Sequence, residues 1–148
     1  MGYSAWHART QAGDQCLQQD QPGMALIHYL AAIEQARYWM EQINDNTDDE
    51  YRIETITLFL RSCMNLSRYW YIQSDLQEQQ RYLLEACQYQ DYLHETTDIH
   101  ESALKGALLT YYKSLCHIIA HHPESETLAP LRTQANQLEQ SLGLTSAF

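Results

Sequence analysis

Residues 12–32 read AGDQCLQQDQPGMALIHYLAA, and this stretch decides the fold. Its first part places a pair of small residues, Ala12-Gly13, within a helical pattern. Turn residues then interrupt that pattern at Gln19-Asp20-Gln21-Pro22-Gly23. After the turn, small and aromatic residues recur with the spacing of one helix face, at Ala25, Tyr29 and Ala32. The stretch therefore predicts two helices joined by a short polar turn.

The same pattern of helix, polar break and helix occurs twice more along the chain. The second copy runs from Leu66-Ser67 through the Ser74-Asp75 break to Ala86. The third runs from Leu115-Cys116 through His121-His122-Pro123 to Ala135. Repeated helical hairpins bury their apolar faces against neighbouring units, and this is typical of stacked scaffolds whose work is binding.

Apolar periodicity and polar breaks divide the chain into six predicted helices. One clear stripe, at spacings of three and four, comprises Ile53, Ile56, Leu60, Cys63, Ser67 and Trp70. The predicted helices cover residues 3–19, 23–44, 50–73, 76–94, 98–121 and 125–142. Short connections between long helices make neighbours antiparallel. We therefore expect an all-α fold of three stacked antiparallel hairpins (3–44, 50–94 and 98–142) in one domain, residues 1–148.

Composition and charge exclude several classes of protein. Nineteen acidic residues against nine basic ones give a net charge of −10, which argues against a general nucleic-acid binder and against anionic membrane surfaces. The four cysteines are scattered and never form a CxxC pair, so we expect reduced thiols packed as small hydrophobes. No signal peptide or membrane span is visible in the sequence. We expect a cytoplasmic protein.

The first hairpin resembles a tetratricopeptide repeat, whose pattern has a small pair, a turn, and then Ala, an aromatic residue and Ala. The chain departs from that family at Arg9, where Trp is usual, and at Cys16, where Tyr is usual. The period is also longer: Leu66 follows Ala12 by 54 positions and Leu115 follows Leu66 by 49, against about 34 in the family. The resemblance implies a tetratricopeptide-like α-solenoid with elongated hairpins. A helical bundle with a different winding is the alternative.

In tetratricopeptide-like arrays the first helix of each hairpin lines a concave groove, and the charges here can be compared with that arrangement. Residues 55–74 contain Arg61 and Arg68 but no acid, and residues 102–122 contain Lys105 and Lys113 but no acid. The second helices carry the acidic residues instead, namely Glu34, Glu41, Glu78, Glu85, Asp91, Glu126 and Glu139. The sequence therefore predicts a locally basic groove on an acidic protein.

Superposition on the family pattern implies which side chains enter this groove. The candidates for partner binding are Arg61, Met64, Asn65, Arg68, Tyr71, Thr110, Lys113, His117 and His121. Guanidinium groups make paired hydrogen bonds with carboxylate or phosphate, so an acidic peptide, phosphate or sulfate is the expected occupant. Ordinary solvated residues on exposed helix faces are the alternative interpretation. The family's clamp for a terminal carboxylate needs Lys and Asn here, and only Asn65 fits that pattern.

The predicted function is that of a non-enzymatic adaptor or scaffold that binds a protein or peptide partner. A secretion-type chaperone is a second possibility, and self-association through the groove or through Leu142, Leu144 and Phe148 is a third. His117 and His121 have the i, i+4 spacing of a helical metal pair, which allows a metal-dependent enzyme such as a hydrolase. No further ligand stands at a familiar spacing. We therefore predict no metal, no cofactor and no catalytic residue.

Overall fold

The computed structural model of the protein describes residues 3–89 and 102–144, and within these ranges the chain is entirely helical. Six α-helices and one 3-10 turn occur there, and no strand is present in these residues. The elements are α1 (Tyr3–Gln18), α2 (Pro22–Glu41), α3 (Asp49–Ile72), α4 (Leu76–Cys87), α6 (Ser102–His121), η1 (Glu126–Leu128) and α7 (Ala129–Leu142). The predicted all-α class is confirmed.

Helix boundaries follow local side-chain chemistry. Asp48 caps α3, because its carboxylate accepts a hydrogen bond from the Tyr51 N–H at 2.8 Å. Asp75 caps α4 in the same way, accepting from the Glu78 N–H at 3.1 Å. Gly143 ends α7 in the left-handed region, at φ 66°, where glycine carries no steric cost.

Two predicted helices are too long. The second was expected to reach residue 44, but α2 ends at Glu41. Asn44 competes with the helix, since its side chain accepts from the Asn46 N–H and its own N–H donates to Thr47 Oγ1, both at 2.8 Å. The fourth was expected to reach residue 94, but α4 ends at Cys87 in a turn at residues 88–89. Residues 90–94 of that prediction, with Asp91, and residues 98–101 of the fifth helix lie outside the described ranges.

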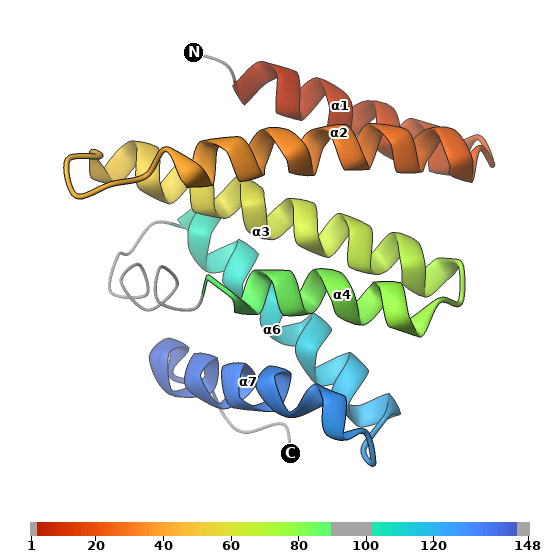
Figure 1. The fold of residues 1–148 in the computed structure, drawn as a ribbon, viewed down its shortest axis with the longest axis vertical. Helices are drawn as coiled ribbons and strands as arrows, with labels where there is room; N and C mark the ends of the chain where they lie inside the picture. Colours follow the sequence, from red (N-terminus) through yellow and green to blue (C-terminus); the bar gives the residue numbers. More distant parts are fainter. Residues whose placement is uncertain (1–2, 90–101, 145–148) are drawn as a thin grey trace.

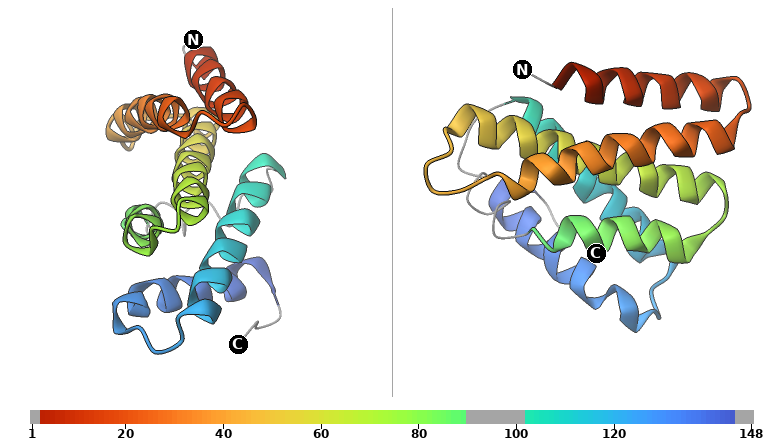
Figure 2. Two further views of the ribbon diagram at one scale, coloured as in Figure 1. Left: turned by 90° about the vertical axis from the view of Figure 1, so that its right-hand side faces the viewer. Right: turned by 45° about the horizontal axis from the view of Figure 1, so that its top comes forward.

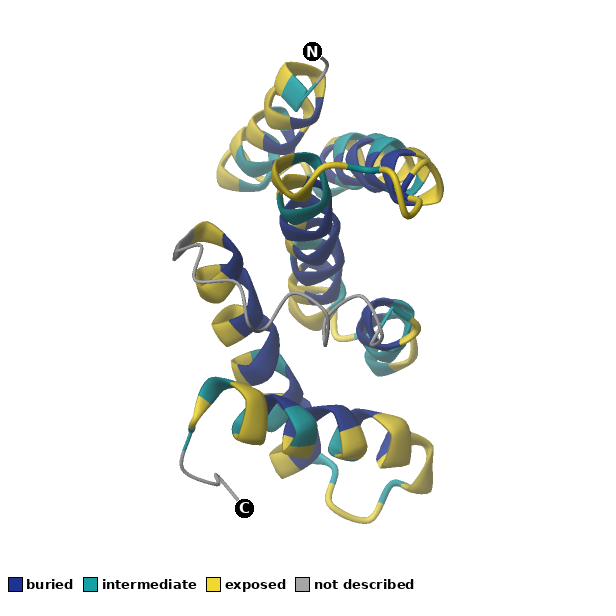
Figure 3. Cartoon of the chain, turned by 90° about the vertical axis from the view of Figure 1, so that its left-hand side faces the viewer, coloured by how far each residue is buried: buried dark blue, intermediate teal, exposed yellow. Residues whose placement is uncertain are grey.

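Helix α3 is the central element of the described structure. Helices α1 to α4 run roughly along one direction, with sequence neighbours antiparallel, while α6 and α7 lie obliquely to them (Figures 1 and 2). Helices α2 and α4 pack on one side of α3, and α6 packs on the other (Figure 3). Every residue from Thr55 to Leu60 is buried, so the burial of α3 is much wider than the single predicted stripe.

Close packing joins α1 to α2 at the small pair that the sequence places there. A Cβ atom added to Gly13 would lie 2.7 Å from Cε1 of Tyr29, so only glycine permits this approach. The Tyr29 hydroxyl donates to Oδ1 of Asp14 at 2.5 Å. Burial, and then this hydrogen bond, raise the pKa of Tyr29 to about 12.

Helix α1 is tied to α3 by hydrogen bonds. Trp6 is fully buried, and its Nε1–H donates to Oγ of Ser62 at 2.7 Å. The Ser62 hydroxyl in turn donates a hydrogen bond to the carbonyl oxygen of Leu58 at 2.9 Å. Near the start of α1 the hydroxyls of Tyr3 and Thr55 lie 3.0 Å apart. These polar contacts explain how serine and threonine are accommodated in the interior of α3.

An ion pair joins α2 to α4 across the side of α3 that these helices cover. Arg37 donates from Nε and Nη2 to the two carboxylate oxygens of Glu85, at 2.7 and 2.6 Å. Its Nη1 reaches Glu34 at 2.5 Å. The hydrogen bonds to Glu85 raise the pKa of Arg37 further above its ordinary value. Two of these hydrogen bonds therefore join α2 to α4, and the third stays within α2.

The cysteines are unpaired, as predicted. Cys63 and Cys87 are buried, and Cys16 and Cys116 are partly buried. Burial raises the pKa of Cys63 well above its ordinary value, which keeps the thiol protonated and unreactive. None of the helices in residues 3–89 and 102–144 combines the length and apolar character that crossing a membrane requires.

Candidate functional site

A row of adjoining hollows runs between α3 and α6, and we call it the α3–α6 groove. Successive hollows share lining residues: Thr57, Arg61 and Ala103 at one junction, Arg68, Thr110 and Ser114 at the next, and Tyr71, Gln79 and His117 at the last. The groove therefore extends from Glu50, near the start of α3, to His122, just past the end of α6.

The middle of the groove has walls of unequal side-chain size. Arg61, Met64, Asn65 and Arg68 line it from α3, and the α6 wall consists of Ala103, Gly106, Ala107, Thr110 and Ser114. The hollow between them has a volume of about 570 Å³. Small residues on α6 leave this space open, and a Cβ added to Gly106 would meet nothing within 4 Å. An extended or helical segment can therefore approach α6 closely while the long α3 side chains reach over it.

Helix α1 positions both arginines of the groove. The Arg61 guanidinium lies over the ring of Trp6, 5.0 Å from its centroid, which is cation–π geometry. Nη2 of Arg68 lies 3.6 Å from Oδ1 of Asp14, the oxygen that also accepts from Tyr29. Both arginines are exposed to solvent. They are held in place from one side and retain guanidinium N–H groups that can face an occupant.

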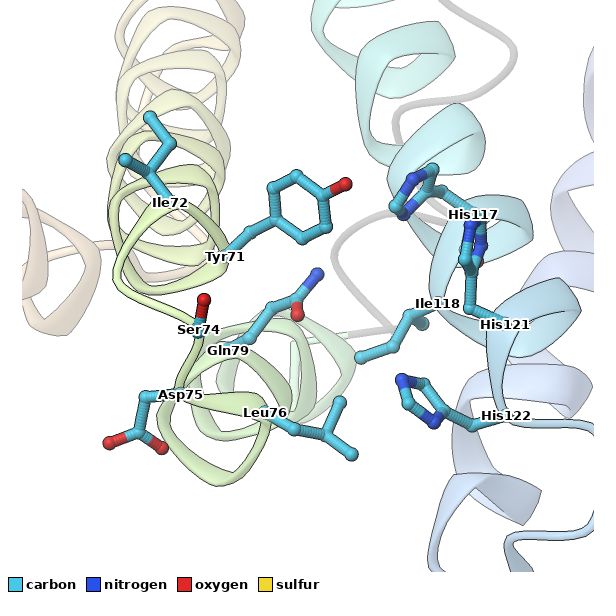
Figure 4. Close-up of a pocket in the computed structure, with 10 residues that line it drawn as sticks. All are labelled: Tyr71, Ile72, Ser74, Asp75, Leu76, Gln79, His117, Ile118, His121 and His122. Atoms are coloured by element: carbon cyan, nitrogen blue, oxygen red, sulfur yellow. The ribbon is translucent and has the colours of Figure 1, made fainter.

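Aromatic rings line the end of the groove near the C-termini of α3 and α6 (Figure 4). Tyr71 extends from α3 toward His117 of α6, edge to face, with ring centroids 5.1 Å apart. The His117 and His121 rings stack at 4.2 Å. Nδ1 of His121 lies 2.8 Å from the His117 carbonyl oxygen, and because a carbonyl only accepts, this nitrogen carries the hydrogen. The other ring nitrogen of a neutral His121 is then an acceptor.

The structure brings the predicted groove residues together along one surface. Arg61, Met64, Asn65 and Arg68 share the central hollow, Lys113 and His117 line the next one with Arg68 and Tyr71, and His121 lies at the end. Thr110 lines two of these hollows. Lys105 is exposed, but the groove hollows do not include it.

Sequence reasoning missed the residues that support the groove and those at its other end. Trp6 and Asp14 reach it from α1, and no periodicity signals a contact between distant helices. Glu50 and Glu54 line its beginning together with His7. The sequence does indicate that these two acids share a helix face with Arg61, since Glu50, Glu54, Thr57 and Arg61 follow one another at helical spacings of three and four.

The two stacked histidines do not gain further metal ligands within the described part of the chain. No group of three or more His, Cys, Asp or Glu side chains in these residues is arranged to hold a metal ion. Zinc and similar ions need three or four protein ligands for a stable site. The pair is therefore a polar, aromatic wall of the groove in this structure.

Fold and site together define a small all-α protein with a long surface groove of mixed charge. The chain belongs to the family described as "Protein of unknown function (DUF2753)", whose model matches residues 4–146. Neither the curated proteins nor the solved structures provide a match to this chain. The function must therefore be argued from the groove itself.

Proposed function

We propose that this protein is a non-enzymatic adaptor or scaffold that holds an acidic segment of a partner protein in the α3–α6 groove. The observation that carries the proposal is the central hollow, in which Arg61 and Arg68 stand on α3 opposite small residues of α6. Such a hollow accepts a peptide backbone on its small-residue wall and carboxylates on its guanidinium wall.

Electrostatics supports an acidic occupant. The whole chain carries −10, yet residues 55–74 and 102–122 contain no acid. An acidic segment therefore meets a local surface of opposite sign in the middle of the groove, although the molecule as a whole carries a negative charge. Because the arginines are exposed, their contacts with a partner are screened by salt, and binding weakens as ionic strength rises.

We also propose that the helix pairs α1–α2, α3–α4 and α6–α7 form a short tetratricopeptide-like array with elongated hairpins. Three contacts support this arrangement: α2 packs on α3, α3 on α6, and α4 on α7. In such an array α3 and α6 are the inner helices, and the groove between them is the expected binding surface. The oblique setting of α6 and α7 widens the angle between the last two hairpins (Figure 2).

The proposal is tested by titrating the protein with a fluorescently labelled polyglutamate peptide and following anisotropy at low and physiological salt. We expect saturable binding that weakens with salt. Reversing both groove arginines (Arg61→Glu with Arg68→Glu) should abolish binding or lower the affinity at least about tenfold, because each charge attraction is replaced by a repulsion.

The matched control is Arg81→Glu, a charge reversal at an exposed arginine of α4 that none of the groove hollows includes. It should leave peptide binding within about twofold of wild type. Circular dichroism should show equal helical content in all three proteins. Equal binding by the double variant and wild type would mean that the groove arginines do not contact the partner.

A further inference from the structure

The beginning of the α3–α6 groove differs in charge from its middle. Glu50 and Glu54 line a hollow of about 610 Å³ there, together with His7, Ile53 and Arg61. Both carboxylates are exposed, and they lie at successive positions on one face of α3. Arg61 borders this hollow but is turned onto the ring of Trp6. A cationic side chain of an occupant therefore finds two carboxylates at this end.

The opposite end carries the reverse charge. Arg68, Lys113, His117 and His121 line the groove there, with His122 beyond them. Among the residues that the structure describes, Asp14 contacts this end and Asp75 lines it. Asp14 neutralises part of Arg68, and Asp75 accepts a hydrogen bond from the Glu78 N–H while its carboxylate points away from the imidazoles (Figure 4).

The distance between the two ends suits a short peptide. From Glu54 to Tyr71 the helix rises about 25 Å at ~1.5 Å per residue. An extended segment of about eight residues spans that distance. A segment of this length can touch the carboxylates at one end and the basic and histidine side chains at the other at the same time.

We infer that the groove selects a charge-segregated segment, with basic residues over Glu50 and Glu54 and acidic residues over Arg68, Lys113 and the histidines. This inference rests on the proposed function and narrows the class of partner. A uniformly acidic segment gains the same contacts at the basic end but meets repulsion at Glu50 and Glu54. The groove therefore distinguishes a uniformly acidic segment from one that has an acidic half and a basic half.

The test compares labelled peptides of equal length in anisotropy titrations. One carries glutamates in its first half and lysines in its second, another has the halves exchanged, and a third carries glutamate at all these positions. We expect the better of the two charge-segregated peptides to bind about threefold to tenfold more tightly than the all-glutamate peptide, as two exposed charge pairs suggest. Salt should reduce this preference.

Charge reversal at Glu54 locates the effect. Glu54→Lys should remove the preference or invert it, because it raises the affinity for the all-glutamate peptide and lowers the affinity for the charge-segregated one. The matched control is Glu41→Lys, the same change at an exposed residue on the α2–α4 side of α3, which should leave the preference unchanged.

Each outcome has a distinct meaning. A preference that disappears in Glu54→Lys and persists in Glu41→Lys supports the inference. If the all-glutamate peptide binds wild type as tightly as the segregated peptides, and Arg61→Glu with Arg68→Glu still abolishes its binding, the inference is wrong while the proposed function stands. If no peptide binds, both are wrong.

Discussion

The two sides of α3 use the same residue types for different purposes. On the side covered by α2 and α4, Arg37 makes hydrogen bonds to both oxygens of Glu85 and a further bond to Glu34. On the side facing α6, Arg61 and Arg68 are held only by an aromatic ring and by a single longer ion pair. The first arrangement engages all three guanidinium nitrogens of Arg37 in hydrogen bonds to carboxylates, and the second leaves the two arginines exposed along a groove.

This difference separates charged side chains that hold helices together from charged side chains that stay exposed in the groove. The Arg37 and Glu85 side chains are 27% and 17% exposed, whereas the Arg68 side chain is 56% exposed. Removing one charge of a half-buried pair leaves the other charge without a hydrogen-bond partner. In an exposed pair, water takes the place of the missing partner. Stability should therefore respond to changes on the packed side, and binding to changes on the groove side.

The largest effect on stability is expected at Trp6. Replacing this fully buried side chain by alanine should lower the free energy of unfolding by about 3–5 kcal/mol, through lost burial and a cavity. Tyr71→Ala, an aromatic on the groove side that is 52% exposed, should change it by less than about 0.5 kcal/mol. Urea unfolding followed by circular dichroism measures both.

If Trp6→Ala does not fold, Trp6→Phe provides the same comparison. It retains a ring but removes the Nε1–H that donates to Ser62, so a loss of about 1 kcal/mol is expected. Equal losses for the Trp6 and Tyr71 variants would contradict the distinction between buried aromatic side chains and exposed ones that line the groove.

A smaller effect is expected at the ion pair between α2 and α4. Arg37→Met should lower the free energy of unfolding by about 1–3 kcal/mol, since Glu85 is left without its partner in a half-buried position. The control is Arg81→Met, which breaks the exposed pair with Glu78 and should cost less than about 0.5 kcal/mol. A double-mutant cycle with Glu85→Gln isolates the pair energy, and a coupling near zero would count against a structural role for Arg37.

The smallest of the three effects concerns pH, and it tests the link between the packed interior and the groove through Asp14. The pKa of Tyr29 is about 12 in the folded protein and about 10 when unfolded. Between these values the unfolded chain releases the proton and the folded chain keeps it, so stability falls as pH rises. Ionisation of Tyr29 in the unfolded chain should lower the free energy of unfolding by about 1 kcal/mol between pH 10 and pH 11.

Urea unfolding at several alkaline pH values checks this expectation by variant. Tyr29→Phe should show a shallower loss of stability with pH than wild type, because the ionising group is gone. The loss of stability with pH in Asp14→Asn should lie between those of wild type and Tyr29→Phe. This substitution removes the carboxylate charge that helps to raise the pKa of Tyr29. Identical slopes in all three proteins would show that Tyr29 ionises equally in the folded and unfolded states.

Spacing along the chain was sufficient to predict that residues 3–89 and 102–144 are helical, although two helices were predicted too long. The side chains that line the groove from α3 and α6 were predicted from the resemblance to the tetratricopeptide repeat. The sequence was not sufficient to identify α3 as the buried centre. Thr55, Thr57 and Ser62 lie outside the predicted apolar stripe, yet they are buried. Thr57 and Ser62 satisfy their hydroxyls on backbone carbonyls one turn earlier, at 2.8 and 2.9 Å, which lets polar residues enter a core.

The contribution of α1 to the groove could not be predicted for a different reason. Arg61 contacts Trp6, and Arg68 contacts Asp14, because of the position of α1 along the axis of α3. Tertiary packing sets that position. The overlong α4 prediction has a simpler cause. Helical spacing continues past Cys87 in the sequence, although the chain turns there.

The contact between Arg61 and Trp6 gives the groove an optical consequence. The emission of an indole ring responds to a charge lying over its face, and here that charge belongs to a side chain that also lines the α3–α6 groove. An occupant that draws the guanidinium toward its own carboxylates moves the charge away from the ring. Tryptophan fluorescence can therefore report occupancy of the groove without any added label, and unlabelled segments can be screened as partners by their effect on this signal.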